Sequence, residues 1–212
     1  MIMKAVLLAI GLTFIVLHCA SAQNIADPIR DYLTTRDADR DAVMPNLTKL
    51  FVVKCDLTNS GKLSILISFD GYGGHQGNYW TAYLPTGSGY VKADDSDTTL
   101  LFHRDAFYVG RVAGKYGLLA YAPGKGGGDL NLFQIVNGKV TEQKIGSFDL
   151  SKPQDKKEIE SYFGEGGDWK SLKNYSVKTL SVDELKHAGY DADAAIQGAK
   201  NANHPLNRPL GN

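Results

Sequence analysis

The segment 71–80 has the residue types of a ligand-binding loop. It reads Gly-Tyr-Gly-Gly-His-Gln-Gly-Asn-Tyr-Trp and lies between stretches typical of strands. Glycines let a backbone approach a ligand closely, and aromatic rings stack on the flat groups of sugars and peptides. Imidazole and amide groups add directional hydrogen bonds. We therefore predict a ligand-binding surface formed by Tyr72, His75, Gln76 and Tyr79.

Acid–base chemistry is the alternative use of the same region. Asp70 directly precedes the loop, and a carboxylate working with an imidazole, here Asp70 with His75, can move protons in hydrolysis. His103 and the acidic run 94–97 are further candidates. The sequence contains neither G-x-S-x-G nor H-E-x-x-H, so no nucleophile or metal motif is recognisable. We favour a non-catalytic domain that binds a protein or a glycan, with a small secreted hydrolase as the alternative.

Three further segments fit ordinary connections better than sites. The glycine-rich run 124–129 lacks the order of a phosphate loop and leads into a strand, which predicts a hairpin loop. Residues 103–105, His-Arg-Asp, lie between strands and could form a polar site or an ordinary turn, of which we favour the turn. The acidic run 94–97 could hold calcium with the help of backbone carbonyls, but its like charges favour a solvated loop. We predict no cofactor and no metal.

The segment 56–67, Asp-Leu-Thr-Asn-Ser-Gly-Lys-Leu-Ser-Ile-Leu-Ile, resembles one repeat of the FG-GAP and VCBS families. Asp56, Gly61 and the apolar strand that follows match the D-x-N-x-D-G-x-x-D-L hairpin of those repeats. The resemblance implies an extracellular binding protein with a calcium-binding loop. The chain departs from the pattern at three ligand positions, which are occupied by Thr58, Ser60 and Ser64. Since calcium takes about six to eight oxygen ligands, the resemblance supports the loop geometry more than the metal.

The N-terminus has the pattern of a secretory signal. Lys4 precedes the uncharged apolar run 5–17, and the small residues at 20–22 form a signal-peptidase site. Cleavage after Ala22 would leave Gln23 as the first residue and send the protein to the periplasm or the cell exterior. The run is too short for a membrane span, and no second stretch approaches the ~20 apolar residues that a span needs.

The cysteines limit the redox chemistry. Cys19 lies inside the signal, and Cys55 is the other cysteine of the chain, so no internal disulfide is expected after cleavage. A lipid anchor on Cys19 is not predicted because the bulky His18 precedes it. Cys55 alternates with Phe51 and Val53, which favours a buried apolar role over a reactive thiol.

The charge balance bears on the partner. The chain has 23 basic and 23 acidic side chains, and such a balance argues against a nucleic-acid binder, which normally has a basic face. The charge balance is compatible with a protein or glycan partner. The sequence does not determine the oligomeric state.

Alternation of apolar and polar residues predicts about eight strands between 50 and 145. Their connections are too short for parallel crossovers, so the strands should pair antiparallel. Asn137-Gly138 has the sequence of a two-residue type I′ hairpin turn. Alternation also predicts a buried face that contains Leu63, Ile65, Ile67, Phe69 and, on a later strand, Trp80, with Lys62 and Ser64 exposed.

The flanking segments favour helices. Asp27-Pro28 begins a short N-terminal helix, and Ser181 with Glu184 forms a capping box. The fold class is therefore mainly β (α+β), an antiparallel sheet arranged as a sandwich, an open curved sheet or a partial barrel. A full propeller is not expected, because eight strands make only two blades. The predicted segments are the signal 1–22, a helical segment 23–48, the β domain 49–146, a helical extension 147–200 and a frayed tail 201–212.

Overall fold

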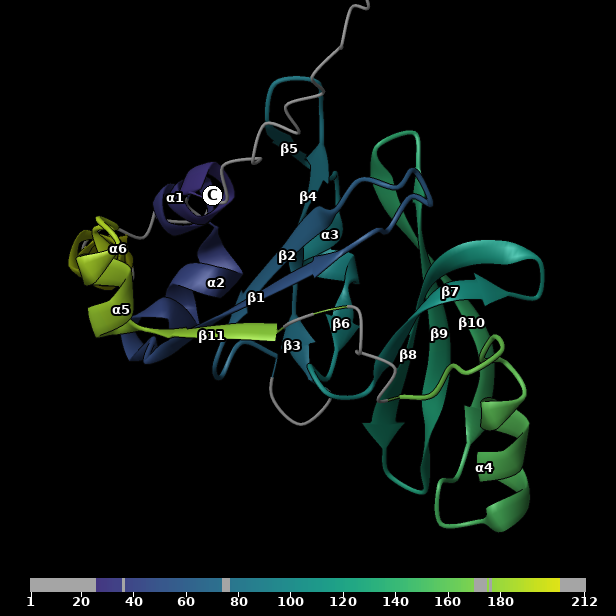
Figure 1. Ribbon diagram of the computed structural model, residues 1–212. Coiled ribbons are helices and arrows are strands. Elements are labelled where there is room, and N and C mark those ends of the chain that lie inside the picture. The colour runs from purple at the N-terminus through teal and green to yellow at the C-terminus, as the bar shows by residue number, and fades with distance from the viewer. Residues whose placement is uncertain (1–25, 36, 74–76, 170–174, 176, 203–212) are drawn as a thin grey trace, which may run out of the picture.

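The computed structural model describes residues 26–35, 37–73, 77–169, 175 and 177–202, and it confirms a mixed α+β fold built on antiparallel sheets. Two sheets dominate the molecule, and short helices from the two ends of the chain gather on the far side of the first sheet (Figure 1). Within the described residues, no helix is both long enough and apolar enough to cross a membrane.

The first sheet has five strands in the order β11-β1-β2-β4-β5. Their bounds are Val177–Ser181, Lys49–Cys55, Ser64–Phe69, Thr81–Pro85 and Tyr90–Lys92. Four of them follow one another along the chain, and β11 returns from the C-terminal region to pair with β1. The predicted helical extension thus contributes a strand to the sheet.

The second sheet is a four-stranded meander in the order β10-β9-β8-β7. Its strands are Phe107–Val112 (β7), Lys115–Gly124 (β8), Gly127–Val136 (β9) and Lys139–Phe148 (β10). A short pair, β3 (Asn78–Tyr79) with β6 (Leu101–Phe102), lies between the sheets (Figure 1). Asn137 and Gly138 have φ of 52° and 82°, which confirms the predicted turn between β9 and β10.

The helices are short and cover the sheets. Beside the first sheet lie α1 (Ala26–Thr34), α2 (Ala38–Val43), the 3₁₀ turn η1 (Met44–Asn46), α5 (Val182–His187) and α6 (Ala192–Ala202). The other two are α3 (Ser96–Thr99), which follows β5, and α4 (Pro153–Glu160), beside the second sheet (Figure 1). The capping box of α5 is confirmed, since the Ser181 and Glu184 side chains each accept a hydrogen bond from the other's backbone N–H.

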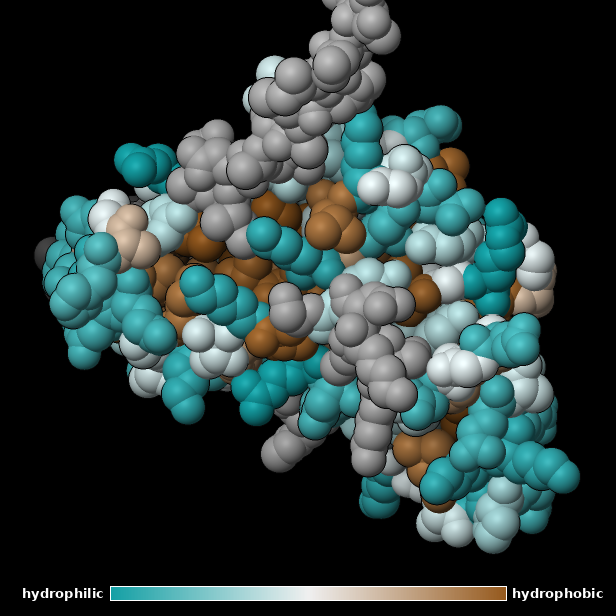
Figure 2. All heavy atoms as spheres, viewed as in Figure 1, coloured by the Kyte–Doolittle hydropathy of each residue, from teal (hydrophilic) through white to brown (hydrophobic). Residues whose placement is uncertain are grey.

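Three apolar clusters hold these layers together. One lies between the first sheet and the helices, one between the two sheets, and one between the second sheet and α4. Figure 2 shows brown apolar side chains gathered between the helices and the first sheet, on an otherwise mostly hydrophilic face. Trp80 is fully buried between the sheets, as predicted, with Ala82 and Leu84.

Strand β2 corrects the predicted pattern of exposure. Ser64 is buried, and Leu63, which was expected in the core, is 43% exposed just before the strand begins. Ser64 is buried because β2 lies at the centre of the sheet and has an apolar cluster on each of its faces. Ile65, Ile67 and Phe69 face the helices, while Leu66 faces the second sheet.

The Cys55 thiol is fully buried on the face of β1 toward the second sheet. Burial, reinforced by the neighbouring Asp56 carboxylate, raises the pKa of Cys55 far above its ordinary value. Because the thiolate is the reactive form, we expect Cys55 to resist alkylation by iodoacetamide at pH 8 and to react within minutes in 6 M guanidinium. Mass spectrometry of the two samples tests this. Rapid labelling of the native protein would contradict a closed core.

Candidate functional site

Two of the four predicted loop residues pack inward. Tyr72 is 5% exposed, and its ring stacks on Phe69 with centroids 5.1 Å apart and planes 3° apart. The half-buried Tyr79 ring lies 5.4 Å from Tyr72 at an interplanar angle of 53°. Burial raises the pKa of the Tyr72 hydroxyl. Tyr72 therefore has one ring face occupied by the core. His75 and Gln76 lie outside the described residues.

The loop glycines serve close packing. Gly77 has φ of 123°, and a Cβ built there would lie 2.5 Å from the carbonyl carbon of Phe102. A Cβ on Gly73, at φ of 127°, would lie 2.3 Å from the Gly77 oxygen. A side chain at Gly77 would push the loop off β6, and one at Gly73 would clash within the loop itself. The backbone freedom of glycine is thus used to fasten the loop to its neighbour.

A cleft of about 410 Å³ opens beside this loop and is called the turn cleft below. It is lined by Lys49, Phe51, Asp70, Gly71, Gly77, Asn78, His103, Arg104 and Asp105. The start of β1, the end of β2, the loop and the turn after β6 all contribute. The cleft brings together Asp70 and His103, two of the candidates for acid–base chemistry. Tyr79 does not line it; with Tyr72 and Asp97 it lines a separate hollow of about 380 Å³ next to α2.

The carboxylate of Asp70 is committed to the fold. One oxygen accepts hydrogen bonds from the backbone N–H groups of Thr48 (3.1 Å) and Lys49 (2.8 Å), and the other accepts one from the Thr48 hydroxyl. Burial alone would raise the pKa of Asp70, but these bonds to the ionised form outweigh it and lower the pKa. Asp70 therefore stays ionised at neutral pH and fixes the start of β1.

This lowered pKa makes a pH-dependent contribution to stability. A carboxyl group whose pKa is lower in the folded state stabilises the fold above its unfolded pKa of about 3.9, and this contribution is lost as pH falls through the folded pKa. We expect Asp70→Asn to unfold at a lower temperature than the wild type at pH 7. The difference should shrink steadily below about pH 4. Thermal unfolding followed by circular dichroism between pH 3 and pH 7 measures it; a difference independent of pH would contradict the assignment.

The turn cleft also contains two cationic side chains, those of Arg104 and Lys49. The Arg104 guanidinium lies over the ring of Phe51, 4.7 Å from its centroid, and Phe51 itself is buried. Within the described residues, neither Arg104 nor the side chain of Lys49 forms an ion pair with a carboxylate. A stacked guanidinium keeps its N–H edges available. The cleft can therefore offer two positive charges to a ligand.

Two carboxylates of the acidic run 94–97 form ion pairs with lysines. Asp97 pairs with Lys92 and Asp95 with Lys139, each at 2.5 Å, and residues from Ser96 onward form α3. The predicted solvated loop is thus wrong in part, because a helical turn and two ion pairs order this segment. In the described part of the chain, no three His, Cys, Asp or Glu side chains gather in a way that could hold a metal ion.

The loop that resembles an FG-GAP hairpin is organised by Asp56. Its carboxylate accepts hydrogen bonds from the N–H groups of Thr58 (3.0 Å), Ser60 (3.2 Å) and Gly61 (2.7 Å). Asn59 and Gly61 adopt the left-handed conformation that this tight turn requires. The structure thus has a glycine-containing turn between the two core strands β1 and β2. The run 124–129 also forms a hairpin as predicted, with Gly124 paired to Gly127.

Sequence reasoning considered residues 103–105 as a polar site but favoured an ordinary turn, and it missed Phe51 and Lys49 as site residues. The alternating pattern identifies Phe51 only as an inward-facing strand residue. The sequence around Phe51 does not indicate that an arginine some fifty residues later covers its ring. No protein-family model, no curated protein and no solved structure matches this chain.

Proposed function

We propose that this chain is a secreted, non-catalytic binding domain that holds a carboxylate-bearing protein or glycan ligand in the turn cleft. The observation that carries the proposal is the Arg104 guanidinium over Phe51, without a carboxylate partner among the described side chains. Stacking holds the guanidinium plane in place, so that little ordering is left to do when a ligand carboxylate forms two parallel hydrogen bonds with it. Lys49, across the cleft, adds a second positive charge.

The contacts of Asp70 argue against the hydrolase. A general acid must hold a proton near neutral pH, whereas the pKa of Asp70 is lowered and both of its oxygens accept hydrogen bonds. His75 and Gln76 belong to the proposed binding surface on the evidence of the sequence alone. Secretion rests on the signal pattern at residues 1–22.

Binding to defined acidic and neutral probes tests the proposal. Polygalacturonate and dextran serve as glycan probes, and a peptide with a free or amidated C-terminus serves as the protein probe; affinity is measured by isothermal titration calorimetry. We expect at least one carboxylate-bearing probe to bind and its neutral counterpart to bind more weakly. Arg104→Gln should weaken binding by about tenfold or more, since a hydrogen-bonded charge pair contributes roughly 1.5–3 kcal/mol.

Arg111→Gln is the matched control. Arg111 is an exposed arginine on β7 whose guanidinium contacts only the Gly114 carbonyl among the described residues. Its loss removes the same charge from the protein without touching the turn cleft. Equal weakening by both variants would reduce the effect to net charge, and retained binding by Arg104→Gln would place the ligand elsewhere.

A further inference from the structure

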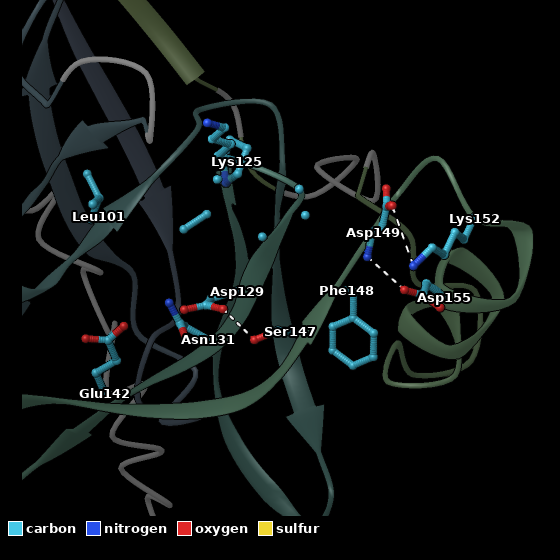
Figure 3. Close-up of a pocket in the computed structure, with 16 residues that line it drawn as sticks. Leu101, Lys125, Asp129, Asn131, Glu142, Ser147, Phe148, Asp149, Lys152 and Asp155 are labelled. Atoms are coloured by element: carbon cyan, nitrogen blue, oxygen red, sulfur yellow. Dashed lines mark hydrogen bonds and ion pairs between the residues drawn. The ribbon is translucent and has the colours of Figure 1, made fainter.

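A second hollow, of about 480 Å³, lies on the other sheet and belongs to none of the features assigned above. It is called the hairpin hollow, and Figure 3 shows its labelled lining. Its walls come from the turn between β8 and β9, the adjoining parts of β9 and β10, Leu101 of β6, and the segment that leads into α4. The volume falls within the range of about 300–1,000 Å³ typical of small-molecule sites.

The feature that points to a ligand is Asn131. This residue is only 8% exposed, yet its amide lines the hollow (Figure 3). Across the part of the chain that the structure describes, its side chain makes no hydrogen bond, and its polar atoms are not among those closed off from solvent without a partner. Amides that are buried to this degree are normally hydrogen-bonded, and an amide that opens only into a hollow is available to whatever fills the hollow.

Glu142 stands beside it on the same face of the sheet. Asn131 of β9 pairs with Lys144 of β10, and Glu142 is the next β10 residue on that face, diagonal to Asn131. Its carboxyl group forms no hydrogen bond or ion pair with any described residue. Partial withdrawal from water, reinforced by the nearby Asp129 carboxylate, raises the pKa of Glu142. A carboxyl and an amide without partners among the described residues are therefore diagonal neighbours on one face of the sheet.

The other carboxylates of the hollow already have partners. Asp129 pairs with Lys144 and accepts a hydrogen bond from the Ser147 hydroxyl, each at 2.8 Å. Asp155 accepts one from the Asp149 N–H at 2.8 Å, and the Asp149 carboxylate accepts one from the Ser151 hydroxyl at 2.7 Å (Figure 3 draws the first). Ion pairs with Lys144 and Lys152 offset the charges of Asp129 and Asp149, and Lys125 adds a further positive charge to the wall.

We infer that the hairpin hollow binds a neutral sugar residue through Asn131 and Glu142. Neighbouring sugar hydroxyls each donate and accept a hydrogen bond, as an amide next to a carboxyl group requires. Leu101, which faces this pair across the hollow, offers an apolar surface for the C–H face of the ring (Figure 3). The site is independent of the turn cleft and selects a neutral ligand where the turn cleft selects an acidic one.

Titration followed by ¹⁵N–¹H NMR tests the inference on the mature protein. The probes are cellotriose, maltotriose and N-acetylchitotriose, with putrescine and calcium chloride as cationic probes. We expect at least one trisaccharide to shift the side-chain amide resonances of Asn131 saturably, and neither cation to do so. Absence of any trisaccharide shift at 10 mM, or saturable shifts with a cation alone, would overturn the inference.

Variants then assign the contacts. Asn131→Leu is nearly isosteric and should weaken trisaccharide binding by about tenfold or more. Glu142 is exposed, so Glu142→Gln should fold normally, and we expect it to weaken trisaccharide binding severalfold. This variant tests the assignment if Asn131→Leu fails to fold. Glu160→Gln, an exposed change on α4, is the matched control and should bind like the wild type. Arg104→Gln should also retain trisaccharide binding, so failure at the turn cleft and failure at the hairpin hollow can be told apart. Unchanged affinity in Glu142→Gln and Asn131→Leu would overturn the assignment.

Discussion

Replacing Ile65 with aspartate should unfold the protein. Ile65 is fully buried in the cluster between the first sheet and the helices, on a central strand that is covered on both faces. An unpaired carboxylate there loses its hydration and displaces apolar contacts, which costs more than about 4 kcal/mol. Because single domains are stable by only about 5–15 kcal/mol, we expect loss of cooperative urea unfolding and of dispersed NMR resonances.

Leu63→Asp is the control for this experiment. The side chain of Leu63 is 43% exposed just before β2 begins, and a change there should alter stability by only about 0.5 kcal/mol. The sequence pattern alone places Leu63 and Ile65 on the same buried face, so the pair also tests the corrected start of the strand. Equal destabilisation by both variants would show that the buried face extends to Leu63.

Trp80→Ala should be the second most damaging change. The indole is fully buried, stacks on Phe102 with centroids 4.9 Å apart, and donates a hydrogen bond from Nε1 to the Phe102 carbonyl at 3.0 Å. Its removal leaves a large cavity between the sheets, and such truncations cost about 3–5 kcal/mol. Urea unfolding followed by circular dichroism should show a correspondingly lower midpoint with little change in slope.

Trp80→Phe separates the two contributions of the indole. Phenylalanine keeps an aromatic ring against Phe102 and fills much of the space, but it cannot donate the hydrogen bond. We expect an intermediate loss, with the missing indole hydrogen bond accounting for about 0.5–1.5 kcal/mol. If Trp80→Ala proved as stable as the wild type, Trp80 would lie outside the core and be free to contact a ligand.

Local patterns predicted most of the second sheet and much of the first. The Asn137-Gly138 turn and the inward face of β1 depend on neighbours in sequence, and the structure has both. The burial of Ser64 could not be predicted, because it depends on a second sheet that packs over β2. Alternation reports one buried face, and it has no signal for a strand that is covered twice.

The candidate site was harder to predict than the fold, because it too depends on contacts between segments that are distant in the sequence. The sequence singled out an aromatic and glycine-rich loop, but Tyr72 is held against Phe69 and Gly77 packs against β6. The Arg104 guanidinium lies over Phe51, which belongs to a distant segment of the chain. The Asn131 amide opens into a hollow whose walls come from several segments. Such juxtapositions arise from tertiary packing, which periodicity and motifs do not encode.

The pairing of β11 with β1 has a consequence for synthesis. Lys49 to Val53 of β1 take their second set of partners from Val177–Ser181, so the edge of the first sheet is closed by a segment made more than 120 residues later. At about 5–20 residues per second, a nascent chain carries that unpaired apolar edge for roughly 6–24 seconds. Unpaired edges are where chains aggregate, and this interval is long enough for a chaperone to bind the segment before the fold can close.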